Sequence, residues 1–196
     1  MSLQFIQYVK DECKNVGVKV ILGKGKNIKY SDTEKCSGYF DSEGKKLACA
    51  TGWDDWVETL VHEFAHFTQW QENTAIWRIC NELNSTTLVN DWLEGIEVND
   101  IKKHIGIVRD MELDNEKRTV ELIRKFQLDI DIELYIKRAN AYIYFHNWMK
   151  ETRRWMKPPN TPYRSQKLTD AMPNHFNNNY NVLPAKLRAI YKSENI

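Results

Sequence analysis

Residues 61–66 read Val-His-Glu-Phe-Ala-His and place two histidines, His62 and His66, four positions apart. Residues at that spacing lie one turn apart on the same side of a helix, so both imidazoles can reach a single metal ion. Glu63 follows the first histidine and can lean over the open coordination position, where it can take a proton from a metal-bound water. The pattern predicts a helix that carries a metal site. An ordinary amphipathic helix with two incidental histidines is the alternative.

The chain before this motif predicts one helix and a little β structure. Apolar residues recur at helical spacing over residues 3–14. Residues 16–22 alternate and are β-branched, which predicts a strand ending at the glycine turn of residues 23–25. Residues 38–41 and 46–50 flank a turn-like Ser-Glu-Gly segment and predict a hairpin.

From Asp54 onward the pattern is helical. Asp54 or Asp55 can cap the motif helix, and a second helical stretch over residues 74–94 stops at Gly95. A third stretch covers residues 99–127, with a break at Gly106 as an alternative. A fourth opens near Asp131, where acidic residues suit the helix dipole, and continues through Trp155.

This order of elements predicts an α+β protein, mainly α, in which a small N-terminal twisted sheet packs on the motif helix and further helices follow. The 196 residues, of which 42% are apolar, are enough to bury a core without cross-links. We expect one domain over residues 1–157. Residues 158–196 are expected to form an irregular extension, with a short helix after Pro184, packed on the same domain.

A catalytic zinc site uses three protein ligands and one water, so a third ligand must come from elsewhere in the chain. Glu112 and Glu116 share the apolar side of the third helical stretch with Val120 and Ile123, where unpaired carboxylates are costly. We assign Glu112 as the ligand and Glu116 as the acceptor of a hydrogen bond from a ligating histidine. The reverse assignment stays open, as does a pair of ordinary surface acids. The other candidates for the third ligand are His104, Asp114, His146 and His175.

The composition bears mainly on the cellular compartment of the protein and on its partners. The four cysteines do not show the spacing of a zinc ribbon or of a secreted disulfide framework, which favours thiols in a reducing compartment. The N-terminus lacks the pattern of a signal peptide and no apolar run reaches membrane-spanning length, so we expect a cytoplasmic protein without membrane partners. The net charge of +1, without a long basic stretch, argues against nucleic acid as a partner.

Together the two motifs resemble those of the zincin metallopeptidases, and within them the glutamate-ligand or gluzincin-like branch. That branch pairs a His-Glu-x-x-His helix with a downstream Glu-x-x-x-Asp or Glu-x-x-x-Glu helix, here residues 62–66 with Glu112 and Glu116. The chain is also similar to small metallopeptidase-like proteins encoded by bacteriophages, which carry Glu-Leu-Asp-x-Glu-x-Arg in the second motif. The resemblance implies a zinc endopeptidase acting on peptide or protein substrates. Its zinc would be held by His62, His66 and Glu112, with Glu63 as general base and later proton donor.

The resemblance also implies a twisted sheet whose edge strand lies above the motif helix and can pair with an extended peptide. Residues 47–50 are the candidate for that edge. The glutamate-ligand zincins usually add a Tyr, His or Arg that steadies the oxyanion. Aromatic residues at this density are more typical of a core, so we assign none of the candidates. These candidates are Tyr142, Tyr144, His146 and Arg153.

Two other functions remain open on the sequence. One is a zinc-stabilised binding protein without peptidase turnover, because a fold can keep its metal while it lacks a productive substrate cleft. The other is a DNA-associated protease that uses a local patch at Arg153, Arg154 and Lys157, although the near-neutral net charge argues against it.

Overall fold

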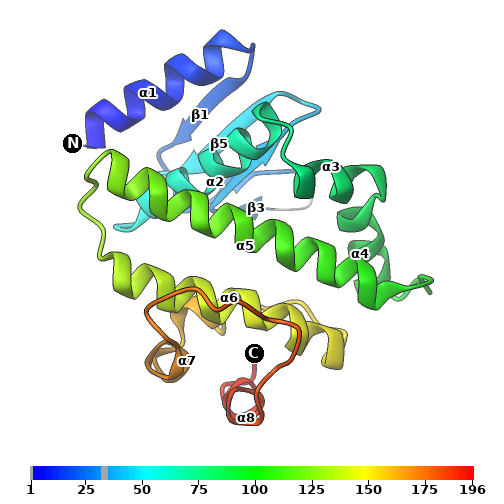
Figure 1. Cartoon of the computed structure of the whole chain (residues 1–196). Coiled ribbons are helices and arrows are strands. Elements are labelled where there is room, and N and C mark those ends of the chain that lie inside the picture. Colours follow the sequence, from blue (N-terminus) through cyan, green and yellow to red (C-terminus); the bar gives the residue numbers. More distant parts are fainter. Residues whose placement is uncertain (1, 32–34) are drawn as a thin grey trace. The chain divides into compact units, whose positions relative to one another are not determined.

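The computed structural model describes residues 2–31 and 35–196, and it confirms an α+β fold that is mainly α with a small N-terminal sheet (Figure 1). It divides into two compact units, residues 1–74 with 115–130 and residues 75–114 with 131–196. The elements are α1 (Ser2–Asn15), β1 (Lys19–Gly23), β2 (Ile28–Lys29), β3 (Lys35–Cys36), β4 (Gly38–Asp41), β5 (Lys46–Ala50), α2 (Trp56–Gln71), α3 (Ala75–Glu82), α4 (Ser85–Leu93), α5 (Ile101–Lys125), α6 (Ile132–Thr152), the 3-10 helix η1 (Pro162–Arg164), α7 (Gln166–Ala171) and α8 (Ala185–Ser193). Helix α5 begins in the second unit and ends in the first.

The first unit contains a three-stranded sheet in the order β1-β5-β4. Strand β5 runs parallel to β1 and antiparallel to β4, so the predicted hairpin of residues 38–41 and 46–50 is confirmed. Asp41 closes its turn, because its Oδ1 accepts a hydrogen bond of 2.8 Å from the amide of Gly44. Strands β2 and β3 pair separately as a two-stranded antiparallel sheet.

The prediction that residues 47–50 form the edge of the sheet was wrong. They belong to β5, which is the central strand, and the outer strands of the described three-stranded sheet are β1 and β4. The reason is visible in the burial of β5, because residues 47–50 are all at most 1% exposed. A continuous apolar run is typical of a strand that is covered on both faces and paired on both sides.

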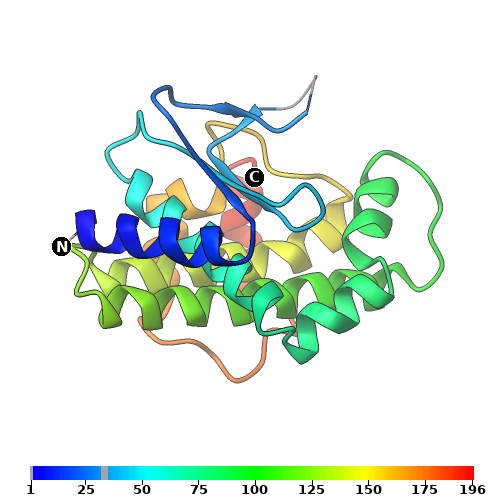
Figure 2. The same cartoon turned by 90° about the horizontal axis from the view of Figure 1, so that it is seen from above.

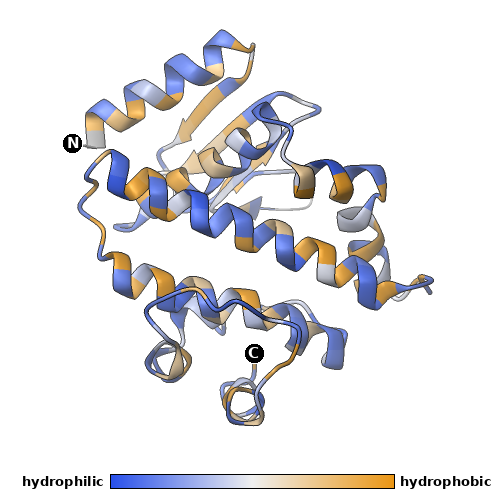
Figure 3. Cartoon of the chain, in the orientation of Figure 1, coloured by the Kyte–Doolittle hydropathy of each residue, from blue (hydrophilic) through white to orange (hydrophobic). Residues whose placement is uncertain are grey.

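Helices α1 and α2 supply most of the rest of the first unit's core, together with Val120 and Ile123 of α5. Helix α2 packs on β4 and β5, and α1 packs on β1 (Figure 2). Phe5 of α1 meets Phe64 of α2 edge to face, with ring centroids 5.9 Å apart, and also contacts Phe126. Strand β1 is largely hydrophobic (Figure 3). These contacts bury one side of α2 and fix its orientation under the sheet.

The second unit is built from helices. The stretch predicted as one helix over residues 74–94 is two, α3 and α4, because Asn84 adopts a left-handed φ of 49° between them. Helix α5 continues through Gly106 without a break, and Gly95 ends the preceding segment with a φ of 104°. Helix α6 begins next to Asp131 as predicted, and the structure adds that Asp131 caps it, since its Oδ1 accepts a hydrogen bond of 3.0 Å from Leu134 N.

The C-terminal segment of the second unit is more ordered than its composition predicts. The short helix after Pro184 is confirmed as α8, whereas η1 and α7 were not predicted. Buried side-chain amides of α6 hold the irregular part: Asn140 Nδ2 donates to the carbonyls of Pro173 and His175, both at 2.9 Å. Such bonds join residues more than 30 positions apart, so no local sequence pattern could reveal them.

Within the part of the chain that the structure describes, no helix is both long enough and apolar enough to span a membrane.

The four cysteines differ in their exposure, which gives a simple test of the fold. Cys13, Cys49 and Cys80 are buried, and Cys36 is only partly so. Burial raises the pKa of Cys13 and of Cys49 to about 12 and also raises that of Cys80. Because the thiolate is the nucleophile, only about one in ten thousand of the thiols with a pKa near 12 is ionised at about pH 8.

We therefore expect native protein at about pH 8 to react rapidly with a disulfide reagent at Cys36 alone, and the denatured chain to react at all four cysteines. The absorbance of the released thiolate measures both. Cys36→Ser should remove the rapid phase. A rapid phase that persists in this variant would contradict the burial of the other three thiols.

Candidate metal centre

Helix α2 presents the two motif histidines as neighbours. The rings of His62 and His66 lie with their centroids 5.0 Å apart and nearly perpendicular, at 86°. Leu60, Phe64 and Phe67 are buried on the same helix, whereas both histidines are only partly buried. The apolar side of α2 thus holds the helix in place, and the imidazoles remain accessible to an ion.

Glu112 on α5 completes a possible ligand set. The candidate ligand atoms of His62, His66 and Glu112 all lie within 4.8 Å of one another, and this is the only such group among the described residues. Two imidazole nitrogens and a carboxylate oxygen form a donor set found in catalytic zinc sites, which leaves a fourth position for water. The three residues can therefore hold a metal ion, and the donor set fits zinc.

Glu116 lies one helical turn beyond Glu112 and contacts the first histidine. Its Oε1 is 3.3 Å from Nδ1 of His62 and its side chain is 6% exposed. A carboxylate in this place can accept the Nδ1 hydrogen and leave Nε2 of His62 to face the ion. The contact is of the kind predicted for Glu116, whereas the choice of Glu112 rather than Glu116 as the ligand stays a prediction.

Gln69 gives the second histidine an equivalent partner, which the sequence reading missed. Oε1 of Gln69 is 2.9 Å from Nδ1 of His66, and the glutamine is completely buried. An amide oxygen only accepts, so the imidazole nitrogen that faces it carries the hydrogen. The other ring nitrogen of His66, Nε2, is then available to bind a metal ion, as Nε2 of His62 is. The signal was available, because Gln69 is a polar residue three positions after His66, on the same side of the helix.

Asn115 is a second contact that the sequence reading missed. Its Nδ2 lies 3.1 Å from Nδ1 of His62 and 3.3 Å from the backbone carbonyl of that residue. Asn115 is completely buried, and Thr119 on the next turn is buried as well. Glu112, Asn115, Glu116 and Thr119 follow the i, i+3, i+4, i+7 spacing of one helix side. A buried polar side of this kind was the signal that could have identified Asn115.

Glu63 lies against the outer strand of the sheet. A Cβ atom added at Gly38 of β4 would be 2.9 Å from Cγ of Glu63 and 3.2 Å from its Oε1. The carboxylate also helps to raise the pKa of Cys49 on β5, although burial of the thiol is the larger cause. The candidate base therefore lies beside the candidate ligand His62 and directly under β4.

The other candidate ligands lie outside the metal-binding group. Nδ1 of His104 is 3.1 Å from Oγ of Ser85. Burial lowers the pKa of His146, against the opposing effect of the Glu112 carboxylate, and its Nδ1 is 3.2 Å from the carbonyl of Tyr142. Neither Asp114 nor His175 belongs to the group.

The residues considered for oxyanion stabilisation have contacts of their own in the second unit. Arg153 donates to the carbonyl of Trp92 at 2.6 Å and to that of Ile96 at 2.9 Å. The hydroxyl of Tyr144 accepts a hydrogen bond of 3.0 Å from Asn177. We therefore continue to assign none of these residues to the oxyanion.

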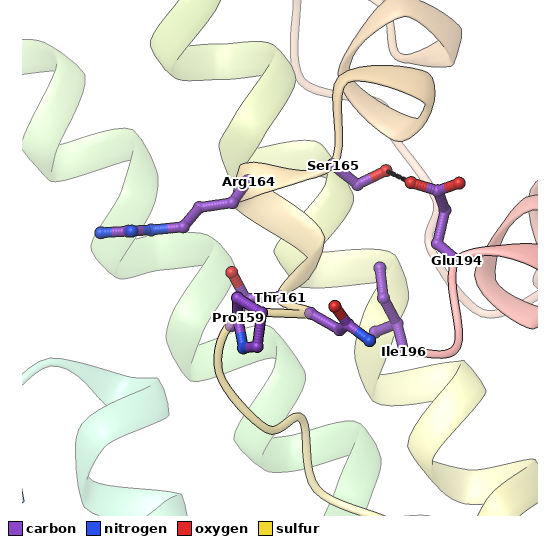
Figure 4. Close-up of a pocket in the computed structure, with 7 residues that line it drawn as sticks. Pro159, Thr161, Arg164, Ser165, Glu194 and Ile196 are labelled. Atoms are coloured by element: carbon purple, nitrogen blue, oxygen red, sulfur yellow. Dashed lines mark hydrogen bonds between the residues drawn. The ribbon is translucent and has the colours of Figure 1, made fainter.

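A small polar pocket in the second unit is distinct from the metal-binding group (Figure 4). It has a volume of about 90 Å³, and Glu194 supplies its carboxylate. Ser165 donates to Glu194 at 3.0 Å and Lys167 at 2.7 Å, whereas Arg164 points away from Glu194 (Figure 4). Its carboxylate is already satisfied by these neighbours, so the pocket suggests no chemistry of its own.

Comparison with known proteins adds no further information on function, because no family model, curated protein or solved structure matches the chain. The ligand set of His62, His66 and Glu112, with its outer contacts, is the feature from which a function can be inferred.

Proposed function

We propose that the protein is a zinc-dependent metallopeptidase that hydrolyses peptide bonds by means of a metal-activated water. The observation that carries this proposal is the convergence of His62, His66 and Glu112 within 4.8 Å, with Glu63 next to the first histidine. Two imidazoles, one carboxylate ligand and an adjacent carboxylate base are the components of metal-assisted peptide hydrolysis.

Each residue has a defined task in this mechanism. When bound, zinc would lower the pKa of a coordinated water and polarise the peptide carbonyl. Glu63 accepts the proton of the water as the carbonyl is attacked and returns that proton to the leaving amine. Glu116 and Gln69 contact Nδ1 of the two imidazoles and would thereby orient both rings, so that Nε2 of each would be available to the metal.

The position of β4 supports a peptide as the substrate class. It is an outer strand of its sheet, and it lies directly over Glu63. An extended peptide can pair with such a strand through main-chain hydrogen bonds, which would bring a carbonyl to the base with little dependence on side chains. The strand that would receive substrate is thus β4 rather than residues 47–50.

Removal of the metal tests the proposal. We expect zinc-loaded protein to cleave members of a mixture of internally quenched peptides, to lose this activity in a chelator, and to regain it on addition of zinc. Zinc at about 100 times its Kd should also stabilise the fold by about 2.7 kcal/mol, measured as a higher Tm. His66→Ala should respond to zinc in neither measurement.

The two measurements separate the proposal from its main alternative. If zinc raises Tm but no peptide or unfolded protein is cleaved, the protein is a zinc-stabilised binding protein and the peptidase proposal is wrong. If zinc changes neither activity nor Tm, the metal site itself is refuted.

A further inference from the structure

Gly38 lies on the face of β4 that is turned toward helix α2. Side chains alternate between the two faces of a strand, and Phe40, two positions later, contacts Phe67 and Trp70 of α2 with ring centroids 5.8 and 5.7 Å apart. A Cβ atom at Gly38 would point the same way. It would lie 2.6 Å from Cγ2 of Thr59 and 2.9 Å from Cγ of Glu63.

These distances are shorter than any that a real Cβ atom tolerates, because contacts below 3.0 Å essentially never occur. The backbone gives no other reason for glycine here. Among the described glycines only Gly17 and Gly95 have a positive φ, so the conformation of Gly38 is open to any residue. Glycine is required at position 38 because Thr59 and Glu63, one turn apart on α2, occupy the space that a side chain would need.

We propose that Gly38 is a positioning residue for Glu63: the missing side chain provides the space in which the Glu63 carboxylate lies against β4, beside the ligand His62. This inference rests on the proposed role of Glu63 as the base and adds the element that places it. A side chain at position 38 would displace the flexible side chain of Glu63 and leave the proposed metal ligands in place, because the atoms nearest to the added Cβ belong to Thr59 and Glu63.

Three measurements on Gly38→Ala test the proposal. In protein labelled with ¹³C at the glutamate carboxyl carbons, the Glu63 resonance, identified by its loss in Glu63→Gln, should shift. Zinc affinity, measured by competition with a coloured chelator, should stay within about threefold of wild type, a smaller change than loss of an outer contact to a ligand gives. The kcat for peptide hydrolysis should fall on the order of 100-fold, as expected for a displacement of about 1 Å.

Gly23→Ala is the matched control. Gly23 lies on β1 of the same sheet, and its added Cβ would meet Cγ2 of Ile28 at 2.8 Å, which is as tight as the contact at Gly38 but does not involve Glu63. We expect a similar loss of stability, with no shift of the Glu63 resonance and no loss of kcat. Equal losses of kcat in both variants would overturn the proposal, because they would reflect a disturbed sheet alone.

A double variant separates stability from positioning. Gly38→Ala/Thr59→Ser removes the nearest obstacle, Cγ2 of Thr59, and should recover stability while the Glu63 resonance stays shifted. In a Glu63→Ala background, the effect of Gly38→Ala on Tm should become smaller. These readouts do not require turnover, so they test the contact even if wild type cleaves no peptide. An unshifted resonance in Gly38→Ala would refute the proposal.

Discussion

His66→Ala is expected to abolish stoichiometric zinc binding, because it removes one of the three proposed protein ligands. The candidate ligand atoms of His62, His66 and Glu112 lie within 4.8 Å of one another, and Nδ1 of His66 is 2.9 Å from Oε1 of Gln69. Loss of a ligand should therefore weaken binding by more than the roughly 10- to 100-fold that loss of an outer contact costs. Metal analysis of the gel-filtered protein and competition titration measure both quantities.

Variants of neighbouring residues show whether the loss is specific. His104→Ala removes a histidine whose Nδ1 contacts Ser85 outside the ligand group, and it should retain one zinc per chain. Glu112→Gln should behave like His66→Ala, whereas Glu116→Gln should retain zinc with an affinity about 10- to 100-fold lower. If Glu116→Gln lost zinc while Glu112→Gln retained it with lower affinity, Glu116 would be the ligand and Glu112 the outer partner. Unchanged zinc content in His66→Ala would exclude the site.

Glu63→Gln is expected to lower kcat for peptide hydrolysis by about 10²- to 10⁴-fold while the zinc content stays at wild-type level. Glutamine has nearly the shape of glutamate, so the contact with Gly38 is kept, but an amide cannot take the proton from the water. Glu63 does not belong to the ligand group, so the metal should remain. Activity and zinc should be measured on the same sample.

The result has a direct consequence for the proposed mechanism. A loss of activity together with loss of zinc would mean that Glu63 supports the metal site rather than the proton transfer. Hydrolysis by Glu63→Gln at the wild-type rate would show that another group acts as the base.

The helices that build the site could be predicted because their signals are local. Spacing along α2 predicts the neighbouring positions of His62 and His66, and the side of α5 that carries Glu112 and Glu116 follows from the helical repeat. The start of α6 near Asp131 was predictable from the acidic residues that suit the N-terminal end of a helix. Each of these features depends on residues within one or two turns of the chain.

The sheet and the outer contacts of the ligands could not be predicted with the same success. The sequence pattern predicts an edge at residues 47–50, but β5 pairs on both sides. Its partner β1 lies 27 positions earlier in the chain, as the pairing of Val20 with Leu47 shows. The contacts of Asn115 with His62 and of Gly38 with Glu63 likewise join different elements. A helical repeat shows which side of α5 is buried but not which helix or strand meets it.

Local sequence patterns were enough to predict the two helical motifs, a small N-terminal sheet and the mainly α character of the chain, because periodicity and helix geometry act over a few residues. The folded structure was needed to show that the candidate ligand atoms of Glu112 and the two histidines lie together, that β5 is central and that β4 lies over Glu63. Those relations come from the packing of elements distant in the sequence, whose pairing depends on shape and burial across the whole core.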